Sequence, residues 1–145
     1  MKVSAKGRYA LRMLLDLAEH RYDGFISLKE IAERQNISKL YLEQIVSLLH
    51  TSDILRANRG KNGGYMLAKE PSSCKVSQIL RITEGSLTPV DCLEDEVNQC
   101  EQAGFCKTLS MWSGLNKVIT GYLNNVSLQD MLEQYEEQSA DNYVI

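Results

Sequence analysis

Apolar residues in the stretch 27–67 recur at helical spacing in two segments and then form two short runs that are typical of strands. Ser27, with Glu30 three residues later, has the spacing of a capping box and predicts the start of a first helix. Asn36 interrupts this helix, and Ser38 is placed to cap a second one. The buried face of the second helix would carry Leu42, Ile45, Val46 and Leu49. Two helices joined by so short a turn predict a helix-turn-helix.

A segment with two basic residues and three glycines, 59–64, separates the strand-like runs and predicts a hairpin. Glycine permits tight turns and lets a backbone approach a phosphate closely. Placed after a helix-turn-helix, this hairpin would be a wing, and Arg59 suits a narrow, electronegative minor groove. A solvated hairpin with ordinary surface charge is the alternative, but the preceding helix pair favours a DNA contact.

The outer face of the second helix is polar and provides candidate DNA contacts. Gln44 has the groups to pair with adenine, and Glu43 can accept a hydrogen bond from cytosine. A further helix predicted over 3–20 begins with basic residues, which oppose its dipole and therefore need an offsetting partner, either phosphate or solvent. The candidate DNA-binding residues are Lys6, Ser38, Tyr41, Glu43, Gln44, Arg59, Lys61, Gly64 and Tyr65.

The charge of the chain is divided unevenly between its two halves. The 145 residues carry a net charge of −3, but residues 1–70 hold 12 basic and 8 acidic residues, whereas residues 71–145 hold 4 and 11. A basic half that coincides with the predicted winged helix indicates a nucleic-acid face. The sequence has no apolar run long enough to span a membrane and no signal-peptide pattern, so we expect a cytoplasmic protein without a membrane partner.

The C-terminal part is predicted to contain a helix whose apolar face is wider than one small winged helix needs to cover. After a short helix at 76–84, for which Ser77 is a candidate cap, this helix spans 107–124. Its apolar residues are Met111, Trp112, Leu115, Val118, Ile119, Tyr122 and Leu123. Symmetric dimerisation would cover the face, and packing within one chain is the alternative. Ser127 and Asp130 form a second capping box, which starts a short helix before a frayed acidic tail.

We therefore expect a mainly α fold with a small β-hairpin wing and a long C-terminal dimerisation helix. The expected winged helix-turn-helix DNA-binding domain spans 1–84, and a cysteine-containing loop spans 85–106. The dimerisation helix and the short helix after it occupy 107–132, and the acidic tail occupies 133–145.

Three of the four cysteines lie on the loop before the long helix. Seven residues separate Cys92 from Cys100, and five separate Cys100 from Cys106. This is not the spacing of a zinc ribbon, but three thiolates on one flexible loop could converge on zinc, cuprous copper or an iron–sulfur cluster. Incidental thiols are the alternative. Cys74 stands apart beside a turn and is interpreted as incidental, with a switching thiol as its alternative.

The chain resembles the IscR/NsrR family of winged-helix transcription regulators over nearly its whole length. The resemblance lies in the runs KGRYALRMLLDLA, SLKEIAERQNIS, YLEQIVSLL, RGKNGGYMLA and LNNVSLQDML. It implies a dimer whose long helix crosses its partner, and a 2Fe-2S or 4Fe-4S cluster held by Cys92, Cys100 and Cys106. It also implies that Arg59 enters the minor groove. The matching recognition-helix positions are Ser38, Tyr41, Glu43 and Gln44.

The chain departs from the family at the fourth cluster ligand. The IscR branch has a histidine three residues after the third cysteine, where this chain has Leu109. Other branches draw a ligand from the partner's N-terminal helix, where this chain has Arg8. An acid such as Asp91 or Glu94, or a small thiol, could complete the site. The long first gap between the cysteines resembles that of iron-responsive members.

The resemblance implies a homodimeric DNA-binding transcription regulator, expected to be a repressor, that reads a palindromic operator in double-stranded DNA. An iron–sulfur cluster that senses iron, redox or nitric oxide status would control its DNA affinity. The alternative is a cluster-free member of the same family that responds to thiol oxidation or to a partner from cysteine metabolism. An enzyme is not expected, because the sequence has no Ser/His/Asp set, no HExxH motif and no glycine-rich phosphate loop before a helix.

Overall fold

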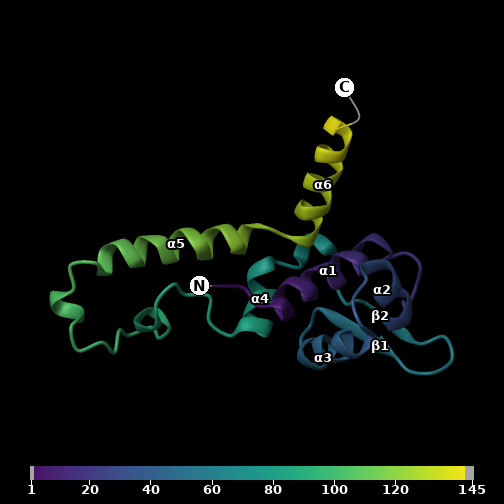
Figure 1. Cartoon of the computed structure of the whole chain (residues 1–145), viewed down its shortest axis with the longest axis horizontal. Helices are drawn as coiled ribbons and strands as arrows, with labels where there is room; N and C mark the ends of the chain where they lie inside the picture. The colour runs from purple at the N-terminus through teal and green to yellow at the C-terminus, as the bar shows by residue number, and fades with distance from the viewer. Residues whose placement is uncertain (1, 143–145) are drawn as a thin grey trace.

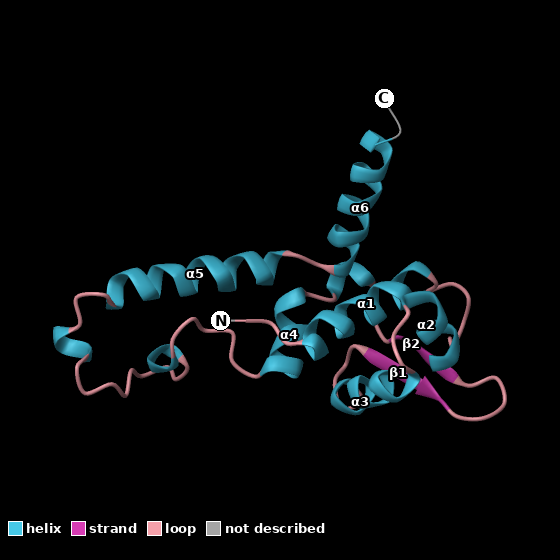
Figure 2. Ribbon diagram, viewed as in Figure 1, coloured by secondary structure: helices cyan, strands magenta, loops and turns pink. Residues whose placement is uncertain are grey.

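The computed structural model describes residues 2–142 and is mainly α-helical, with one small antiparallel hairpin (Figures 1 and 2). The expected fold class is therefore confirmed. The described residues contain no helix that is long and apolar enough to cross a bilayer. In chain order, the helices and strands are α1 (Ala5–Glu19), α2 (Leu28–Gln35), α3 (Lys39–Leu49), β1 (Leu55–Asn58), β2 (Gly64–Leu67), α4 (Val76–Glu84), α5 (Leu109–Asn125) and α6 (Leu128–Asn142). Short 3-10 turns lie at Pro71–Ser73, Asp91–Leu93 and Ala103–Phe105.

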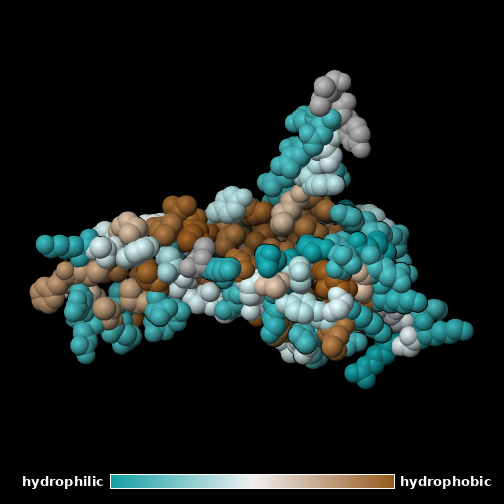
Figure 3. Space-filling model, viewed as in Figure 1, coloured by the Kyte–Doolittle hydropathy of each residue, from teal (hydrophilic) through white to brown (hydrophobic). Residues whose placement is uncertain are grey.

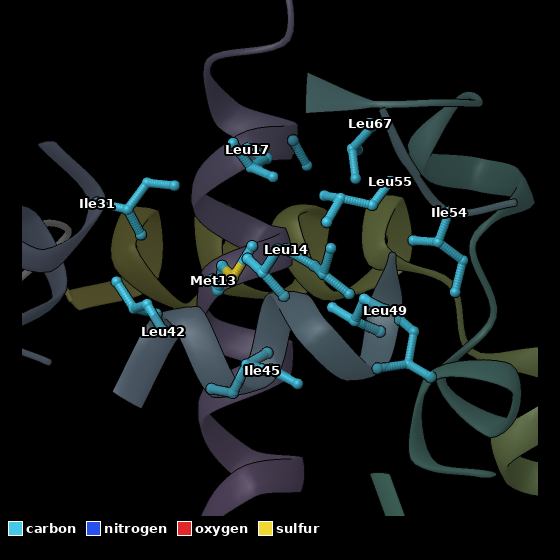
Figure 4. Packing of buried hydrophobic residues seen from close by; sticks show 14 of the residues in the cluster. Met13, Leu14, Leu17, Ile31, Leu42, Ile45, Leu49, Ile54, Leu55 and Leu67 are labelled. Carbon is cyan, nitrogen blue, oxygen red and sulfur yellow. The ribbon is translucent and has the colours of Figure 1, made fainter. Parts of the chain in front are cut away.

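The hydrophobic core lies in the N-terminal half, between α1, α2, α3 and the hairpin, and α4 packs against α1 and α3. The apolar face predicted for α3 is the buried one. Figure 4 shows side chains from these elements converging: Met13, Leu14, Leu17, Ile31, Leu42, Ile45, Leu49, Ile54, Leu55 and Leu67. Burial of these side chains is the main force that holds the helix-turn-helix against α1.

Side-chain caps fix the starts of α2 and α3 as the sequence predicts. Ser27 Oγ accepts a hydrogen bond from the amide of Glu30 at 3.2 Å, and Ser38 Oγ accepts one from the amide of Tyr41 at 3.1 Å. Asn36 adopts the left-handed conformation with φ 54°, which few residues other than glycine and asparagine tolerate. The turn between the two helices is therefore set by local chemistry.

The hairpin is held to the segment that precedes α2. Asn58 pairs with Gly64 at the end of the hairpin next to its loop, and Ile26 exchanges two backbone hydrogen bonds of 2.8 Å with Tyr65. A Cβ atom on Gly64 would overlap the carbonyl oxygen of Ile26, so the close approach of these two backbones requires glycine at this position. The base of the wing is thus fixed to the helix-turn-helix.

The start of α4 differs from the prediction. Ser77 lies inside the helix and is buried, and the N-cap position belongs to Lys75, whose side chain makes no capping hydrogen bond. The amide of Val76 instead donates to the carbonyl of Val126, at 2.9 Å. Because this partner comes from the connection between α5 and α6, local sequence could not identify it.

The long helix α5 extends away from the N-terminal half (Figure 1). None of its residues is fully buried. One side of it packs against α4. Figure 3 shows hydrophobic side chains gathered along α5 on the surface of the molecule. The helix therefore carries an apolar surface that its own chain leaves open.

The last described helix, α6, is longer than the short helix that we expected. It starts with a complete capping box, in which Ser127 and Asp130 exchange hydrogen bonds of 2.9 and 3.1 Å. It continues to Asn142, although we expected a frayed tail from residue 133. Many residues in this stretch are glutamate and glutamine, which favour helices even when exposed. The expected tail residues 143–145 lie outside the described residues.

Candidate nucleic-acid interface and cysteine loop

The outer face of α3 is exposed and polar. Ser38 is exposed at its N-cap, and Glu43 and Gln44 are exposed in its middle. An α-helix fits the major groove of B-form DNA, where carboxylate and amide side chains can distinguish base edges. The structure therefore leaves these three predicted contacts free to meet DNA.

Tyr41 is half-buried and packs back against α1. Its ring meets the ring of Tyr9 edge to face, with 5.4 Å between centroids and 80° between planes. The Arg12 guanidinium lies 5.2 Å from the centre of the Tyr9 ring. Tyr41 thus helps to orient α3 in addition to any contact with DNA. Sequence reasoning missed the role of Tyr9 because its partner Tyr41 lies on another helix.

A buried carboxylate joins α1 to α2. Asp16 is only 2 % exposed and accepts hydrogen bonds of 2.7 and 3.0 Å from Arg34 and one of 3.0 Å from Gln35. Burial by itself raises the pKa of Asp16, but the hydrogen bonds from Arg34 and Gln35 and the charge of Arg34 outweigh it, so the pKa lies below its ordinary value. The guanidinium of Arg12 also donates to the carbonyl of Gln35. This network fixes the helix that precedes α3.

A groove of about 530 Å³ separates α3 from the wing. Lys39, Ser47 and His50 line it from the α3 side, and Arg59 lines it from the hairpin. Glu43 of α3 also lines it, so the groove carries basic, acidic and hydrogen-bonding side chains beside the exposed face of α3. His50, which the sequence analysis left out of the site, thus lies beside predicted contacts.

The other predicted contacts have different settings. Arg59 and Lys61 are exposed on the hairpin loop, and Lys6 is exposed in the first turn of α1. Gly64 and Tyr65 are half-buried, and their backbones contact Ile26 as described above. In the structure, these two residues serve to hold the wing in place.

The three loop cysteines are accessible and lie on a segment without fully buried residues. Cys92 is half-buried in a 3-10 turn, whereas Cys100 and Cys106 are exposed. Among residues 2–142, no three Cys, His, Asp or Glu side chains gather closely enough to hold a metal ion. The donor types suit a soft metal or a cluster, but the loop would have to close to bring the thiols together.

The thiols of Cys106 and Cys74 have opposite environments. The hydroxyl of Thr108 lies 3.3 Å from Cys106 Sγ, and its hydrogen bond, together with backbone amides at the start of α5, lowers the pKa of Cys106. Cys74 is buried in the core, and burial raises the pKa of its thiol. The structure thus separates Cys74 from the accessible thiols.

The Rrf2 family, described as an iron-dependent transcriptional regulator, matches residues 3–134. The chain belongs to the Rrf2 family. It is 36% identical over 147 aligned residues to the HTH-type transcriptional regulator IscR of Yersinia pseudotuberculosis, with 97% of this chain and 88% of that protein covered.

Solved structures of Rrf2-type regulators agree with this assignment. The structure of T. potens IscR is similar with a TM-score of 0.75 and 40% identity, and the alignment covers 95% of this chain and 90% of that one. CymR of B. subtilis, titled the global cysteine regulator, gives a TM-score of 0.76 and 33% identity, with 92% and 98% covered. This Rrf2-family chain is therefore a DNA-binding winged-helix transcriptional regulator and not an enzyme.

Proposed function

We propose that this Rrf2-family protein is a homodimeric repressor that reads a palindromic operator and whose DNA affinity is controlled by an iron–sulfur cluster. The observation that carries the proposal is the combination of an exposed polar recognition face on α3 with three accessible thiols on one loop. The first feature supplies DNA reading and the second supplies a place for a signal. Occupation of an operator would exclude other proteins from it, which is the basis for expecting repression.

The exposed residues of α5 support the homodimer. Met111, Leu115, Val118 and Tyr122 are all exposed, Val118 to 69 % and Tyr122 to 64 %. Their spacing of four, three and four residues is that of a helix seam that pairs with another helix. A helix of this length is about 25 Å long, so two copies could cover each other over several turns. Pairing would place two α3 helices to read two half-sites.

The chemistry of the loop supports a cluster. Cys92, Cys100 and Cys106 would hold it, and soft thiolates are the ligands that iron–sulfur clusters use. The lowered pKa of Cys106 favours the thiolate form that ligation needs. Asp91 and Glu94 are exposed on the same loop and are candidates for a fourth ligand, together with an external small thiol. A bound cluster would supply a centre that is sensitive to iron supply, oxidation and nitric oxide.

The second candidate is a regulator without a cluster that responds to thiol oxidation or to a partner from cysteine metabolism. The accessible thiol of Cys106, with its lowered pKa, favours reaction with oxidants. Likeness to the structure titled as a global cysteine regulator is the other supporting observation. Both candidates use the same winged helix, so they differ only in what the loop senses.

Anaerobic purification followed by reconstitution with iron and sulfide tests the two candidates. We expect visible absorbance, bound iron and sulfide, and a change in affinity for a duplex selected from random DNA when the cluster is removed. If removal of iron leaves the DNA affinity unchanged and a mild oxidant changes it strongly, the cluster-free regulator is favoured. If selection from random DNA enriches no sequence, the DNA binding that both candidates share is contradicted.

A further inference from the structure

Helix α4 is held at both ends by segments that are far from it in sequence. At its start, Val76 donates to the carbonyl of Val126, and the amide of Leu128 donates to the carbonyl of Cys74 at 3.0 Å. These bonds attach α4 to the connection between α5 and α6. Figure 1 shows α4 beside α1, with α5 extending away from it. Helix α4 is therefore in contact with both the DNA-binding half and the long helix.

The other end of α4 caps α1. Glu84 Oε1 accepts hydrogen bonds from the amide and the hydroxyl of Ser4, at 3.1 and 2.5 Å, and from Thr83 Oγ1 at 3.4 Å. Ser4 in turn accepts from the amide of Gly7 at 3.2 Å. A carboxylate at this position stabilises the N-terminus of a helix, where the backbone amides carry partial positive charge. The sequence analysis considered only phosphate or solvent at the start of this helix and did not anticipate a carboxylate from α4.

The fit around Glu84 is tight. A Cβ atom on Gly7 would overlap Glu84 Oε1 and would lie 2.9 Å from a methyl group of Val3. The carboxylate therefore packs directly against the first turn of α1, so a movement of either group toward the other would displace it.

The cysteine loop begins at the next residue. Gly85 follows Glu84 and has φ 78°, a left-handed value that turns the chain out of α4. A cavity of about 220 Å³ lies where four segments meet: residues 2–3 before α1, the end of α4, the start of the loop and α5, which contributes Leu123. Incomplete packing at this meeting point leaves room for the loop and α5 to change position relative to α1.

We propose that Glu84 is a positioning residue that couples the state of the cysteine loop to the DNA-contacting end of α1. This inference rests on the proposed function. Ordering or release of the loop at Gly85 shifts the Glu84 carboxylate, and Glu84 passes this shift to Ser4 and to the first turn that carries Lys6. By thermodynamic reciprocity, DNA binding at the winged helix must then alter the loop.

Hydrogen–deuterium exchange of the full chain tests this coupling, with a duplex selected by the protein from random DNA as the probe. In the wild type, the duplex is expected to slow exchange in α3 and also to change exchange in residues 85–106. In Glu84→Ala, α3 stays protected while the response of the loop falls to less than about a third of the wild-type response. Glu84→Gln, which keeps an oxygen acceptor for Ser4, is expected to retain most of it. Glu137→Ala, which removes an exposed carboxylate of α6, is the charge-matched control and should respond as the wild type does.

Thermal melting of the same variants separates coupling from stability, because a role limited to capping would lower the melting temperature and leave the response of the loop unchanged. An unchanged loop response in Glu84→Ala would overturn the inference. The inference would also be overturned if the duplex protects α3 of the wild type but leaves exchange in residues 85–106 unchanged. A duplex that failed to protect α3 would contradict DNA binding itself, and the inference would fall with it.

Discussion

The winged-helix half and the arm formed by residues 85–125 differ in how far their polar and apolar groups find partners within the chain. In the winged-helix half, the starts of α2 and α3 are capped, Asp16 has charged and polar partners, and apolar faces meet in one core. The arm has no fully buried residue, an exposed apolar seam on α5 and three accessible thiols. The first region is complete within one chain, whereas the second presents groups that a partner and a ligand could use.

Removal of the seam on α5 should have the largest effect. Val118→Asp places a charge in the centre of the exposed apolar stripe, so dimers should dissociate and two-site DNA binding should weaken by about 10²-fold or more. Analytical ultracentrifugation and operator titration measure this. Lys117→Asp, on the adjacent exposed position, is the control. A monomeric wild type, or a dimeric Val118→Asp protein, would show that the seam is not the interface.

A core substitution tests whether the winged-helix half is stabilised by its own hydrophobic core. Leu42→Ala removes a fully buried side chain at the centre of the core and should lower the free energy of unfolding by about 2–5 kcal/mol. Chemical denaturation monitored by circular dichroism measures the change. Leu40→Ala, on the exposed face of the same helix, should change stability by less than about 0.5 kcal/mol. Equal effects of the two substitutions would contradict the placement of α3.

How well the sequence predicts each region follows from the range of the interactions involved. Ser38 capping and the Asn36 turn depend on near neighbours, so periodicity and cap residues predict them. The start of α4 depends on Val126, and the start of α1 is held by hydrogen bonds from Ser4 to Glu84, 80 residues away. No local pattern identifies such partners.

The candidate DNA interface and the cysteine loop show the same difference between local and long-range interactions. Exposed positions on α3 and the accessible thiols follow from periodicity and spacing. The orientation of α3 by Tyr9 does not follow from them, because an aromatic residue on an amphipathic helix normally indicates only core packing. Nor could the sequence show whether the loop thiols converge, since the loop has little packing of its own to fix their positions.

The buried carboxylate of Asp16 allows a pH-dependent test of the stability of the winged-helix half. Asp16→Asn removes the charge that Arg34 faces and should lower the free energy of unfolding by about 1–3 kcal/mol near neutral pH. Because the folded-state pKa of Asp16 is lowered, its contribution is present above the ordinary value of 3.8 and is lost as pH falls through the lower folded-state value. Urea titrations between pH 6 and 3 should therefore show the variant and the wild type converging in acid. A constant difference would exclude this ionic contribution.

The smallest expected effect concerns the wing. Arg59→Ala should weaken DNA binding by on the order of 1 kcal/mol, and more at sites with A/T-rich flanks, because a narrow minor groove attracts an inserted cation. Lys61→Ala, at the neighbouring exposed cation, should weaken all sites alike. Binding to a set of duplexes that differ only in their flanks distinguishes the two. A uniform loss for Arg59→Ala would make it a plain phosphate contact.

The most direct test of the account compares the four cysteines in one experiment. After anaerobic reconstitution with iron and sulfide, Cys92→Ala, Cys100→Ala and Cys106→Ala should each lose the visible cluster absorbance and the cluster-dependent change in DNA affinity. Their melting temperatures should stay close to that of the wild type, because the winged helix has its own core. Cys74→Ala should keep the absorbance and the affinity change but melt earlier, since Cys74 is buried in that core. Wild-type protein that binds no iron, or loss of the absorbance in Cys74→Ala alone, would contradict the assignment of the cluster to the loop.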